Sequence, residues 1–345
     1  MLKISIIIPV YKVEQYIIRC LESVASQNVA DVDLECIIVD DCSPDCSMQL
    51  VREFVDNYHG WIHFLLLSHL QNKGLSATRN TGVEKSSGDY VFFLDSDDCI
   101  TSDCIAKLTS SLVLCPNADC VMGNIYHEKD NCAYMQEGKP ITIINTQKEL
   151  FQGLFDMKIP NSACNRLIRH DILKKNQLLF TEKLLYEDIL WNYNLFLAIH
   201  SVVIVSDVTY IYEDNQNSIV NTTVKRPNDV ANSFCYISGE IVSHLSPCLK
   251  SNCLMYAFTV LLKAVDVLSR FQCEDSVITQ IKDVKAQLMK TTLKSGRFVL
   301  ASFFMLMYKP FCNLLLYDFI RNNYHRLSIL VTRTETVFDK LLCRN

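Results

Sequence analysis

The sequence predicts an α/β fold, in which a mostly parallel central sheet is flanked by helices and followed by a helical C-terminal region. Two observations support this prediction. In the first hundred residues, short apolar runs alternate with amphipathic stretches, which is the pattern of βα units. Beyond Pro227, the apolar residues recur with a helical period. We therefore place a domain boundary near Pro227, with residues 1–226 as one domain and 227–345 as a helical C-terminal domain.

The first βα units are placed by their apolar runs and turn residues. We expect strands at 4–8, 34–39, 62–67 and 90–94, and helices at 13–27, 47–58 and 76–85. Pro9 is expected to stop the first strand, because proline cannot donate a main-chain hydrogen bond. Short polar residues before Ser47 and a glycine at position 88 mark the ends of two helices.

The next stretch predicts a looser arrangement of elements. We expect helices at 103–114, 146–157, 165–175 and 189–199, strands at 119–126 and 202–212, and an exposed loop or hairpin at 128–140. Glu187 and Asp188 come just before one of these helices, where the helix dipole favours negative charge. In the C-terminal region we expect helices at 230–245, 253–271 and 277–293, followed by an aromatic helical stretch after Gly296.

Composition and motifs exclude several classes of function. The formal net charge of −5 provides no basic field for a nucleic-acid backbone, so we expect no nucleic-acid partner. The 16 cysteines contain no Cys-x-x-Cys pair and are scattered, which indicates reduced thiols in the cytoplasm rather than a disulfide scaffold. No Gly-x-Gly-x-x-Gly or Gly-x-x-x-x-Gly-Lys-Ser/Thr motif follows a strand, so dinucleotide redox and P-loop functions lose their main support.

The C-terminal aromatic stretch raises the question of membrane contact. We expect no apolar run to span a bilayer, because the longest candidate, 298–308, is broken by Lys309 and Pro310. For residues 298–317 two interpretations stay open: a helix packed in the C-terminal core, which we favour, and a helix lying in a membrane interface. The expected location is the cytoplasm, with peripheral contact at the inner face of the membrane under the second interpretation.

Acidic side chains follow the predicted strand at 90–94. Asp95, Asp97 and Asp98 lie within four residues, and such close like charges are tolerated best where a divalent cation or hydrogen-bond donors neutralise them. The segments 9–11 and 40–41 follow two other strands. Ligands of open α/β sheets bind at the carboxyl ends of strands, so we expect these segments to meet in one crevice. Taken alone, the aspartate cluster could also be a solvated turn.

Five motifs, in this order, resemble family 2 glycosyltransferases. They are residues 6–11 (IIIPVY), 16–24 (YIIRCLESV), 37–43 (IIVDDCS), 72–82 (NKGLSATRNTG) and 93–98 (FLDSDD). Residues 184–188 (LLYED) are similar to the family's acceptor-side acidic motif, and 210–212 with 217–219 to the segment that closes over the donor. The resemblance covers about residues 3–222. It implies the GT-A fold of nucleotide-diphospho-sugar transferases, with a donor-binding half at about 1–115 and an acceptor half at about 116–226.

The resemblance implies roles for the acidic residues. Asp97 would ligate a Mg²⁺ or Mn²⁺ ion that bridges the two phosphates of a UDP-sugar, and Asp95 would contact the ribose or help to hold the metal. Asp188 is the candidate general base, with Glu187 orienting it or holding an acceptor hydroxyl; an ordinary acidic helix start is the alternative. Direct attack by the acceptor would invert the anomeric carbon. Asp98 is expected to cap the following turn.

A second group of residues is expected to bind the donor. It comprises Pro9, Tyr11, Asp40, Asp41, Arg79, Asp95 and Ser218. Tyr11 would present an aromatic face to the nucleobase, or else pack in the core. Asp41 would accept a hydrogen bond from the base edge, with Asp40 as the fallback. Arg79 would reach the base or a phosphate, or else form an ion pair with Asp40 or Asp95.

Five positions depart from the family's pattern. Lys12 stands where asparagine is usual, Cys42 where glycine is common and Thr78 where alanine is usual. Residues 213–214 are Glu and Asp where a basic residue is frequent, which leaves open how the diphosphate is bound from that side.

We expect an inverting, metal-dependent transferase acting in polysaccharide biosynthesis. It would move a hexose or amino sugar from a nucleoside diphosphate, with uridine favoured, to a hydroxyl of a glycan or a lipid-linked saccharide. A sugar nucleotidyltransferase is one alternative, but it should carry a glycine-rich loop after the first strand, where this chain has residues 9–12 (PVYK). A non-catalytic nucleotide-sugar-binding scaffold is the other. The transferred sugar and a homo-oligomeric state are left open.

Overall fold

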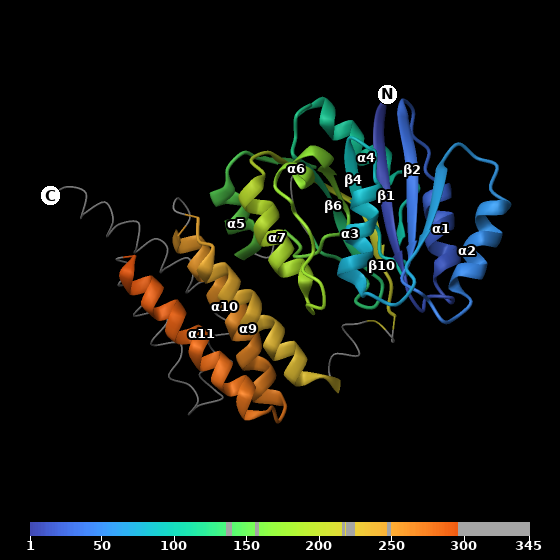
Figure 1. The fold of residues 1–345 in the computed structure, drawn as a ribbon. Helices are drawn as coiled ribbons and strands as arrows, with labels where there is room; N and C mark the ends of the chain where they lie inside the picture. The colour runs from blue at the N-terminus through green and yellow to red at the C-terminus, as the bar shows by residue number, and fades with distance from the viewer. Residues whose placement is uncertain (136–139, 156–158, 216–217, 219–224, 247–249, 296–345) are drawn as a thin grey trace. The chain divides into compact units, whose positions relative to one another are not determined.

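A computed structural model describes residues 1–135, 140–155, 159–215, 218, 225–246 and 250–295 (Figure 1). The chain divides into two compact units. One comprises Met1–Leu150 and Lys158–Asn221, and the other Phe151–Met157 and Thr222–Asn345. The second unit thus includes a short segment near residue 154 that the division at residue 226 assigns to the first. The aromatic stretch after Gly296 lies outside the described residues.

The first unit is built on a ten-stranded sheet in the described part of the chain (Figure 1). The strand order is β3-β2-β1-β4-β9-β6-β10-β5, with β7 paired to β6 and β8 to β10. The strands are β1 Leu2–Val10, β2 Val32–Asp40, β3 His63–Ser68, β4 Tyr90–Phe93, β5 Cys99–Ile100, β6 Cys120–His127, β7 Cys132–Ala133, β8 Ile141–Ile144, β9 Arg166–Arg169 and β10 Val202–Tyr212.

The strands β3, β2, β1 and β4 run parallel, so that their carboxyl ends meet at one edge of the sheet. β6 and β10 are also parallel, whereas β9 pairs antiparallel with both β4 and β6. The first four strands thus form the parallel arrangement that the alternating pattern predicts, within a sheet that is mixed as a whole. The loop or hairpin expected at 128–140 includes a hairpin, because β7 pairs antiparallel with β6.

The expectation that Pro9 stops β1 is wrong, because Pro9 pairs with Val39 inside the strand. The pairing of β1 with β4 ends at Ile7, whose carbonyl accepts the Leu94 N–H at 3.0 Å. Main-chain groups two residues apart face the same side of a strand, so the nitrogen of Pro9 points past the end of β4. No ladder hydrogen bond is lost there, which is why a proline is tolerated.

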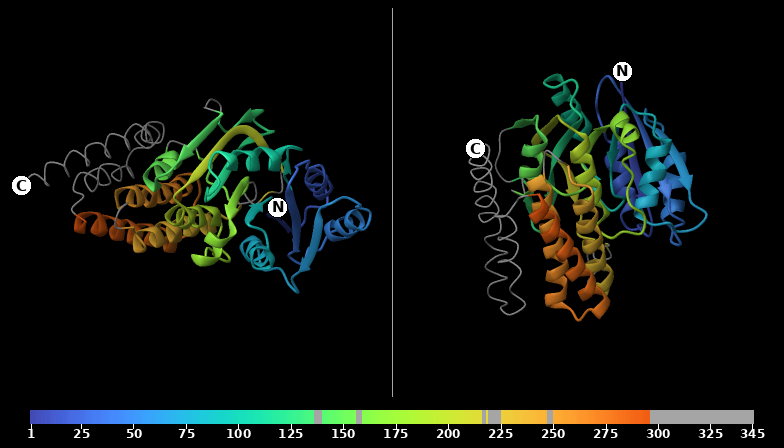
Figure 2. Two further views of the ribbon diagram at one scale, coloured as in Figure 1. Left: turned by 90° about the horizontal axis from the view of Figure 1, so that it is seen from above. Right: turned by 60° about the vertical axis from the view of Figure 1, so that its left-hand side comes forward.

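Helices cover both faces of the parallel strands (Figure 2). α1 and α2 pack together on one face, and α3 packs against β1 and β2 on the other. Gly82 permits this close approach of α3, since a Cβ there would collide with the side chain of Ile7. The helices up to residue 198 are α1 Ile17–Ala25, α2 Ser47–Asp56, α3 Leu75–Lys85, α4 Cys104–Ser110, the 3₁₀ turn η1 Ser111–Val113, α5 Gln147–Phe155, α6 His170–Lys175 and α7 Glu187–Ala198.

The helix predicted at 165–175 is wrong in its first half. Residues Arg166–Arg169 form β9, which fills the space between β4 and β6, and only His170–Lys175 is helical. The side chain of Arg166 is fully buried, where its guanidinium donates to the side chain of Asn192 and the carbonyl of Pro160. Pairing with two strands distant in sequence overrides the local helical pattern here.

Three helices form the described core of the second unit: α9 Pro227–Ser243, α10 Lys250–Arg270 and α11 Asp275–Lys294. They pack against one another and bury an apolar interior. The expectation that no apolar run is long enough to span a bilayer is wrong. By length and composition alone, the helical segment Ser251–Arg270 is long and apolar enough to do so. Half of its apolar window is buried (50%), as in a core helix that packs against α9 and α11.

The cysteines in the described part of the chain are all free, and most are buried in strands and helices. Cys42 and Cys46 are exposed. Cys42 has a φ of 57°, in the left-handed region that favours glycine. This conformation gives a physical reason for the glycine expected at this position.

Candidate active site

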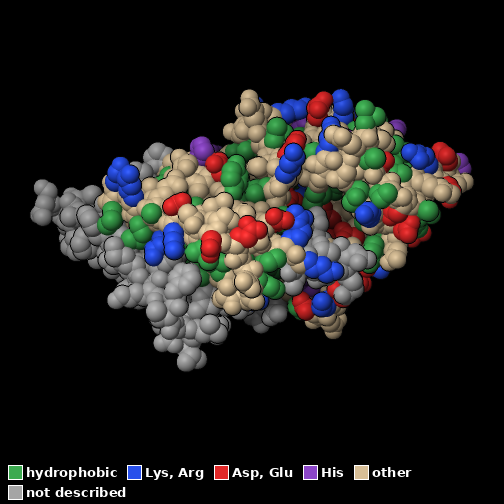
Figure 3. Space-filling view, turned by 60° about the horizontal axis from the view of Figure 1, so that its bottom comes forward, with side chains coloured by type: hydrophobic (Ala, Val, Ile, Leu, Met, Phe, Trp, Pro, Cys, Tyr) green, Lys and Arg blue, Asp and Glu red, His purple; other side chains and the backbone are tan. Residues whose placement is uncertain are grey.

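The candidate residues gather at the carboxyl ends of the parallel strands. Asp95 follows β4 directly after Leu94, Tyr11 follows β1, and Asp40 ends β2. Figure 3 shows this face of the first unit, where acidic side chains line a hollow. The crevice expected from the strand ends is therefore an acidic one.

Arg79 on α3 is the centre of the acidic cluster. Its side chain is only 1% exposed, and its guanidinium lies 5.1 Å from the ring centroid of Phe180. One terminal nitrogen donates to Asp95 at 2.7 Å, and the other donates to Glu187 at 2.9 Å and to Asp188 at 2.8 Å. The guanidinium thus joins an aspartate after β4 to the acidic pair that begins α7.

These contacts favour the ion-pair role for Arg79 over the donor-binding role. The pairing is with Asp95, not with Asp40. Because the buried guanidinium already serves three carboxylates, it acts by holding them in place, and contact with a base or phosphate would require it to leave them.

Glu187 and Asp188 occupy the first turn of α7, which starts after Tyr186 in the left-handed conformation (φ 57°). The second carboxylate oxygen of Asp188 accepts the Ala163 N–H at 3.1 Å. Burial raises the pKa of Glu187 to about 7, and the charge of Asp188 adds to this while Arg79 opposes it. Glu187 therefore retains its proton until close to neutral pH.

This raised pKa predicts a pH-dependent effect of Glu187→Gln on stability. Between its ordinary value of 4.5 and about 7, the folded state holds a proton on Glu187 that the unfolded state has lost. Wild-type stability therefore falls as pH rises through this window, and the variant lacks this loss. In urea unfolding, we expect the variant to gain stability relative to the wild type from pH 5 to pH 8. The exposed Glu182→Gln should show no such gain, and equal pH dependence of all three proteins would contradict the prediction.

Asp97 and Asp98 have different surroundings. Asp97 accepts a hydrogen bond from the Asn215 side chain at 2.8 Å, and burial raises its pKa, as does the charge of Asp95. Asp98 is 3% exposed and accepts the Tyr210 hydroxyl at 2.6 Å and the Glu213 N–H at 3.0 Å. It therefore ties the turn after β4 to the end of β10. The expectation that it caps the following turn is wrong.

The residues present fit a divalent cation that takes most of its ligands from elsewhere. Within the described residues, no group of three or more His, Cys, Asp or Glu side chains is placed to hold a metal. Asp97, however, is a half-buried carboxylate close to a second one, Asp95, and the only side-chain donor to Asp97 among the described residues is the amide of Asn215. Mg²⁺ commonly binds to one or two carboxylates together with phosphates and water. Asp97 and Asp95 meet that requirement.

Asp41 is used differently from the expectation. It is 2% exposed, and its oxygens accept the His69 imidazole at 2.7 Å and the N–H groups of Lys73 at 2.8 Å and Gly74 at 2.7 Å. These contacts hold the loop 69–74 and argue against a hydrogen bond to a nucleobase edge. Asp40, the fallback, accepts only the Ser43 N–H among the described contacts, at 2.7 Å. It is the better candidate for base recognition.

Three residues that the sequence analysis missed support the site. His69 bridges Asp41 and the Thr81 hydroxyl, 2.9 Å away, and only its place directly after β3 could have suggested this. Asn215 binds Asp97, and its carbonyl accepts the N–H of the candidate Ser218 at 3.1 Å. Arg19 on α1 donates to Glu213 at 2.8 Å, so the acidic residue found in place of a basic one is itself neutralised.

Pro9 and Tyr11 lie at the end of β1. Pro9 is buried in the strand, whereas Tyr11 is 41% exposed, which excludes plain core packing for its ring. The Lys12 ammonium lies 5.2 Å from the Tyr11 ring centroid. The Tyr11 ring thus presents an aromatic face at the end of β1, and the Lys12 ammonium forms a cation–π contact with that face.

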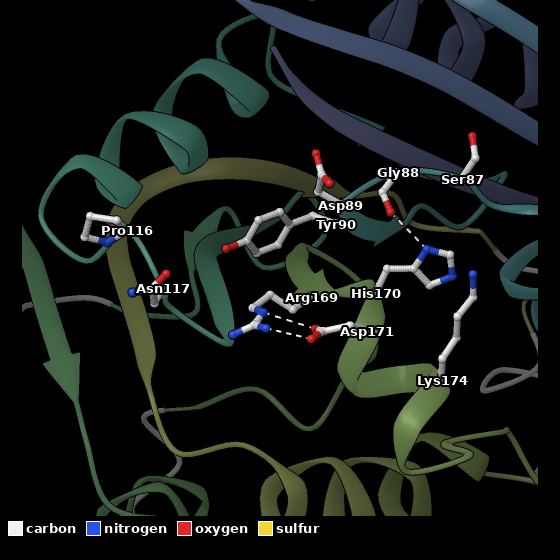
Figure 4. A pocket seen from close by; sticks show the side chains of 10 residues that line it. All are labelled: Ser87, Gly88, Asp89, Tyr90, Pro116, Asn117, Arg169, His170, Asp171 and Lys174. Carbon is white, nitrogen blue, oxygen red and sulfur yellow. Dashed lines mark hydrogen bonds and ion pairs between the residues drawn. The ribbon is translucent and has the colours of Figure 1, made fainter.

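A separate cavity of about 470 Å³ lies at the opposite end of β4 (Figure 4). Gly88 and Asp89 precede the strand there, and Arg169 and Asp171 form an ion pair at 2.7 Å in its wall. The residues that line it include none of the predicted site residues. It is therefore not part of the candidate active site.

A mixed sheet with an aspartate cluster after β4 and an acidic pair at the start of α7 defines a protein with the GT-A fold. The family model described as Glycosyl transferase family 2 matches residues 5–176. The chain belongs to this family.

A relative agrees with this family, and two solved structures agree with the fold. Glycosyltransferase GlyA of Streptococcus pneumoniae is 30% identical over 226 residues, which are 63% of this chain and 31% of GlyA. Staphylococcus aureus TarS is a poly(ribitol-phosphate) β-N-acetylglucosaminyltransferase, and its residues 1–349 have been solved in complex with UDP-GlcNAc. That structure shares the fold with a TM-score of 0.66 at 18% identity, over 96% of this chain and 92% of the 1–349 chain. Pyrobaculum calidifontis mannosyltransferase PcManGT, solved with GDP-Man and Mn²⁺, has a TM-score of 0.56 at 14% identity, over 96% and 86%. The chain spans about a third of the length of GlyA.

Proposed function

We propose that the protein is an inverting, metal-dependent glycosyltransferase that uses a nucleoside diphosphate sugar. The single observation that carries this is the Arg79 cluster, which joins Asp95, on the donor side, to Glu187 and Asp188. A donor-binding aspartate and a candidate base, separated by more than ninety residues, are thereby held by one guanidinium. Residues 1–226 are proposed as the catalytic domain.

On the donor side, we propose that Asp97, assisted by Asp95, holds Mg²⁺ or Mn²⁺. A divalent cation bound there would stabilise the negative charge of the departing diphosphate. Tyr11 would stack on the nucleobase, Asp40 would accept a hydrogen bond from its edge, and Ser218 would contact the donor. Uridine is proposed as the base, and the UDP-GlcNAc complex of TarS supports this choice. Because PcManGT was solved with GDP-Man, guanosine is the alternative base to test.

On the acceptor side, we propose that Asp188 takes the proton of the attacking hydroxyl. The hydroxyl oxygen forms a bond to the anomeric carbon as the bond to the diphosphate breaks, and the configuration inverts. Arg79 and the Ala163 N–H each bind one oxygen of Asp188, which fixes the orientation of the carboxylate. Glu187, bound to the same guanidinium, would hold an acceptor hydroxyl or orient Asp188.

The acceptor is proposed to be a glycan or a lipid-linked saccharide in polysaccharide biosynthesis. The name of TarS, which acts on poly(ribitol-phosphate), supports a cell-envelope polymer. A cytoplasmic location is proposed with it, since nucleotide sugars would be the donors. The donor class is tested by incubating the protein with Mn²⁺ and each member of a panel of UDP- and GDP-sugars. Hydrolysis of the nucleotide sugar is measured in the absence of acceptor. Binding of a donor without turnover on any acceptor would favour the scaffold alternative.

Asp97→Asn is expected to remove the metal-dependent part of donor affinity. The amide keeps the size of the side chain but not the charge that binds the cation, so titration of Mn²⁺ should no longer tighten binding of the preferred nucleotide. Calorimetry with and without Mn²⁺ measures this. The control is Asp207→Asn, whose carboxylate is 51% exposed and pairs with Lys107. A Mn²⁺ effect in Asp97→Asn equal to that of the wild type would contradict the metal assignment.

A further inference from the structure

Three cations near the acidic end of the sheet are already paired with carboxylates in the described residues. Arg79 is committed to three carboxylates, and Arg19 is paired with Glu213 at 2.8 Å and lies 3.6 Å from Glu128. Lys129 lies 3.5 Å from Asp214. The diphosphate of a donor would bring further negative charge to this region. Because these cations already neutralise carboxylates, they and one metal ion would leave part of the diphosphate charge unbalanced.

Lys12 differs from these cations. It follows β1 and its ammonium has no ion pair among the described residues, where its one recorded contact is the ring of Tyr11 at 5.2 Å. Its backbone is held firmly, because the Lys12 N–H donates to the Ser43 hydroxyl at 2.8 Å. The side chain is exposed, so the ammonium is free to turn from the ring toward a ligand.

The place of Lys12 connects it to the metal-binding candidate. It lines a cavity of about 270 Å³ together with Asn215, whose side chain donates to Asp97 at 2.8 Å. The two carboxylates in this cavity are occupied: Glu14 accepts the Cys46 N–H at 2.9 Å, and Asp45 accepts the hydroxyls of Ser43 and Ser47 at 2.6 and 2.7 Å. Neither pairs with Lys12 in the described structure.

We propose that Lys12 binds the diphosphate of the donor, supplying the positive charge that residues 213–214 lack. The inference rests on the proposed function, since it needs a nucleoside diphosphate whose base takes the Tyr11 ring. A base stacked on that ring displaces the ammonium, which then reaches the phosphates on the side of the cavity shared with Asn215. The Lys12 ammonium thus packs on the Tyr11 ring when no donor is bound, and it contacts the diphosphate when the donor is bound.

Binding of nucleotides with and without the second phosphate tests this on the full chain. UDP and GDP are titrated by calorimetry with Mn²⁺, and whichever binds the wild type more tightly is compared with its nucleoside. For Lys12→Met we expect the diphosphate to bind about tenfold more weakly, in the range of one charge-assisted contact, and the nucleoside to bind unchanged. Lys12→Arg should stay within about threefold of the wild type, because it keeps the charge.

The matched control is Lys174→Met, an exposed lysine at the opposite end of β4. It should bind the diphosphate like the wild type. A wild type that binds neither UDP nor GDP overturns the proposed function and this inference with it. A wild type that binds while Lys12→Met binds the diphosphate equally well overturns the inference alone. Equal weakening of diphosphate and nucleoside also overturns it, since the loss then does not lie at the phosphates.

Discussion

Asp188→Asn is expected to lower kcat by a factor of about 10²–10⁴, the usual contribution of a general base, with the KM of the donor changed by less than about twofold. The amide cannot accept the acceptor proton at neutral pH. It keeps the shape of the carboxylate and one of the two acceptors that bind Arg79 and Ala163, so the first turn of α7 is retained. Steady-state kinetics with the donor identified in the panel measures both constants.

Two comparisons separate a base from a residue that only supports the structure. The binding of UDP or GDP to Asp188→Asn should match that of the wild type, because Asp188 has no donor role in the proposal. Glu187→Gln should lose less kcat than Asp188→Asn, since Glu187 orients or binds rather than removes the proton. Wild-type turnover of Asp188→Asn would show that the base lies elsewhere.

Arg79→Met is expected to destabilise the first unit by about 3–5 kcal/mol, the usual effect of removing one partner from a buried ion pair. The change leaves three carboxylates close together without a cation. Loss of the guanidinium also removes the charge that holds down the pKa of Glu187, so the cost should shrink as pH falls from 8 to 5 and Glu187 takes up a proton. Transfer activity should be lost at both pH values, because the donor-side aspartate and the base are no longer joined.

Urea unfolding followed by tryptophan fluorescence measures this stability. Trp191 is a suitable probe, since its ring is 2% exposed and stacks on Phe180, 4.5 Å between centroids, directly beside Arg79. Arg169→Met is the control: its pair with Asp171 is one-third exposed, and such pairs contribute about 0–1 kcal/mol. Equal unfolding of Arg79→Met and Arg169→Met at pH 8 would refute the buried-cluster account.

The alternating elements of the first hundred residues could be predicted because their signals are local. Apolar runs bounded by polar turns indicate β1, β2 and β4 within one or two residues at most ends. β10 was expected at 202–212 and occupies Val202–Tyr212. β9 could not be found in this way, because it becomes a strand only by pairing with β4 and β6. The four residues Arg166–Arg169, with an arginine at each end, do not by themselves indicate these pairing partners.

The candidate site shows the same division. The motifs indicate Asp95, Asp97, Glu187 and Asp188, and the structure brings Asp95 together with the acidic pair through Arg79. The individual partners were not predictable. Asp40 and Asp41 are adjacent and chemically identical, yet Asp41 binds the loop 69–74, whereas the side chain of Asp40 accepts only the Ser43 N–H among the described contacts. Which of two neighbouring carboxylates is occupied depends on which loop folds against it.

The sequence by itself determined the α/β architecture, the family and the acidic residues at the strand ends, because hydrophobic periodicity and motif order are properties of neighbouring positions. Only the tertiary structure decided how the charges are balanced: Arg79 serves three carboxylates, Asp98 binds the end of β10, and Lys12 keeps an unpaired ammonium in the described structure. Electrostatic partners are chosen by distance in space, and residues that become neighbours through folding can be more than a hundred positions apart.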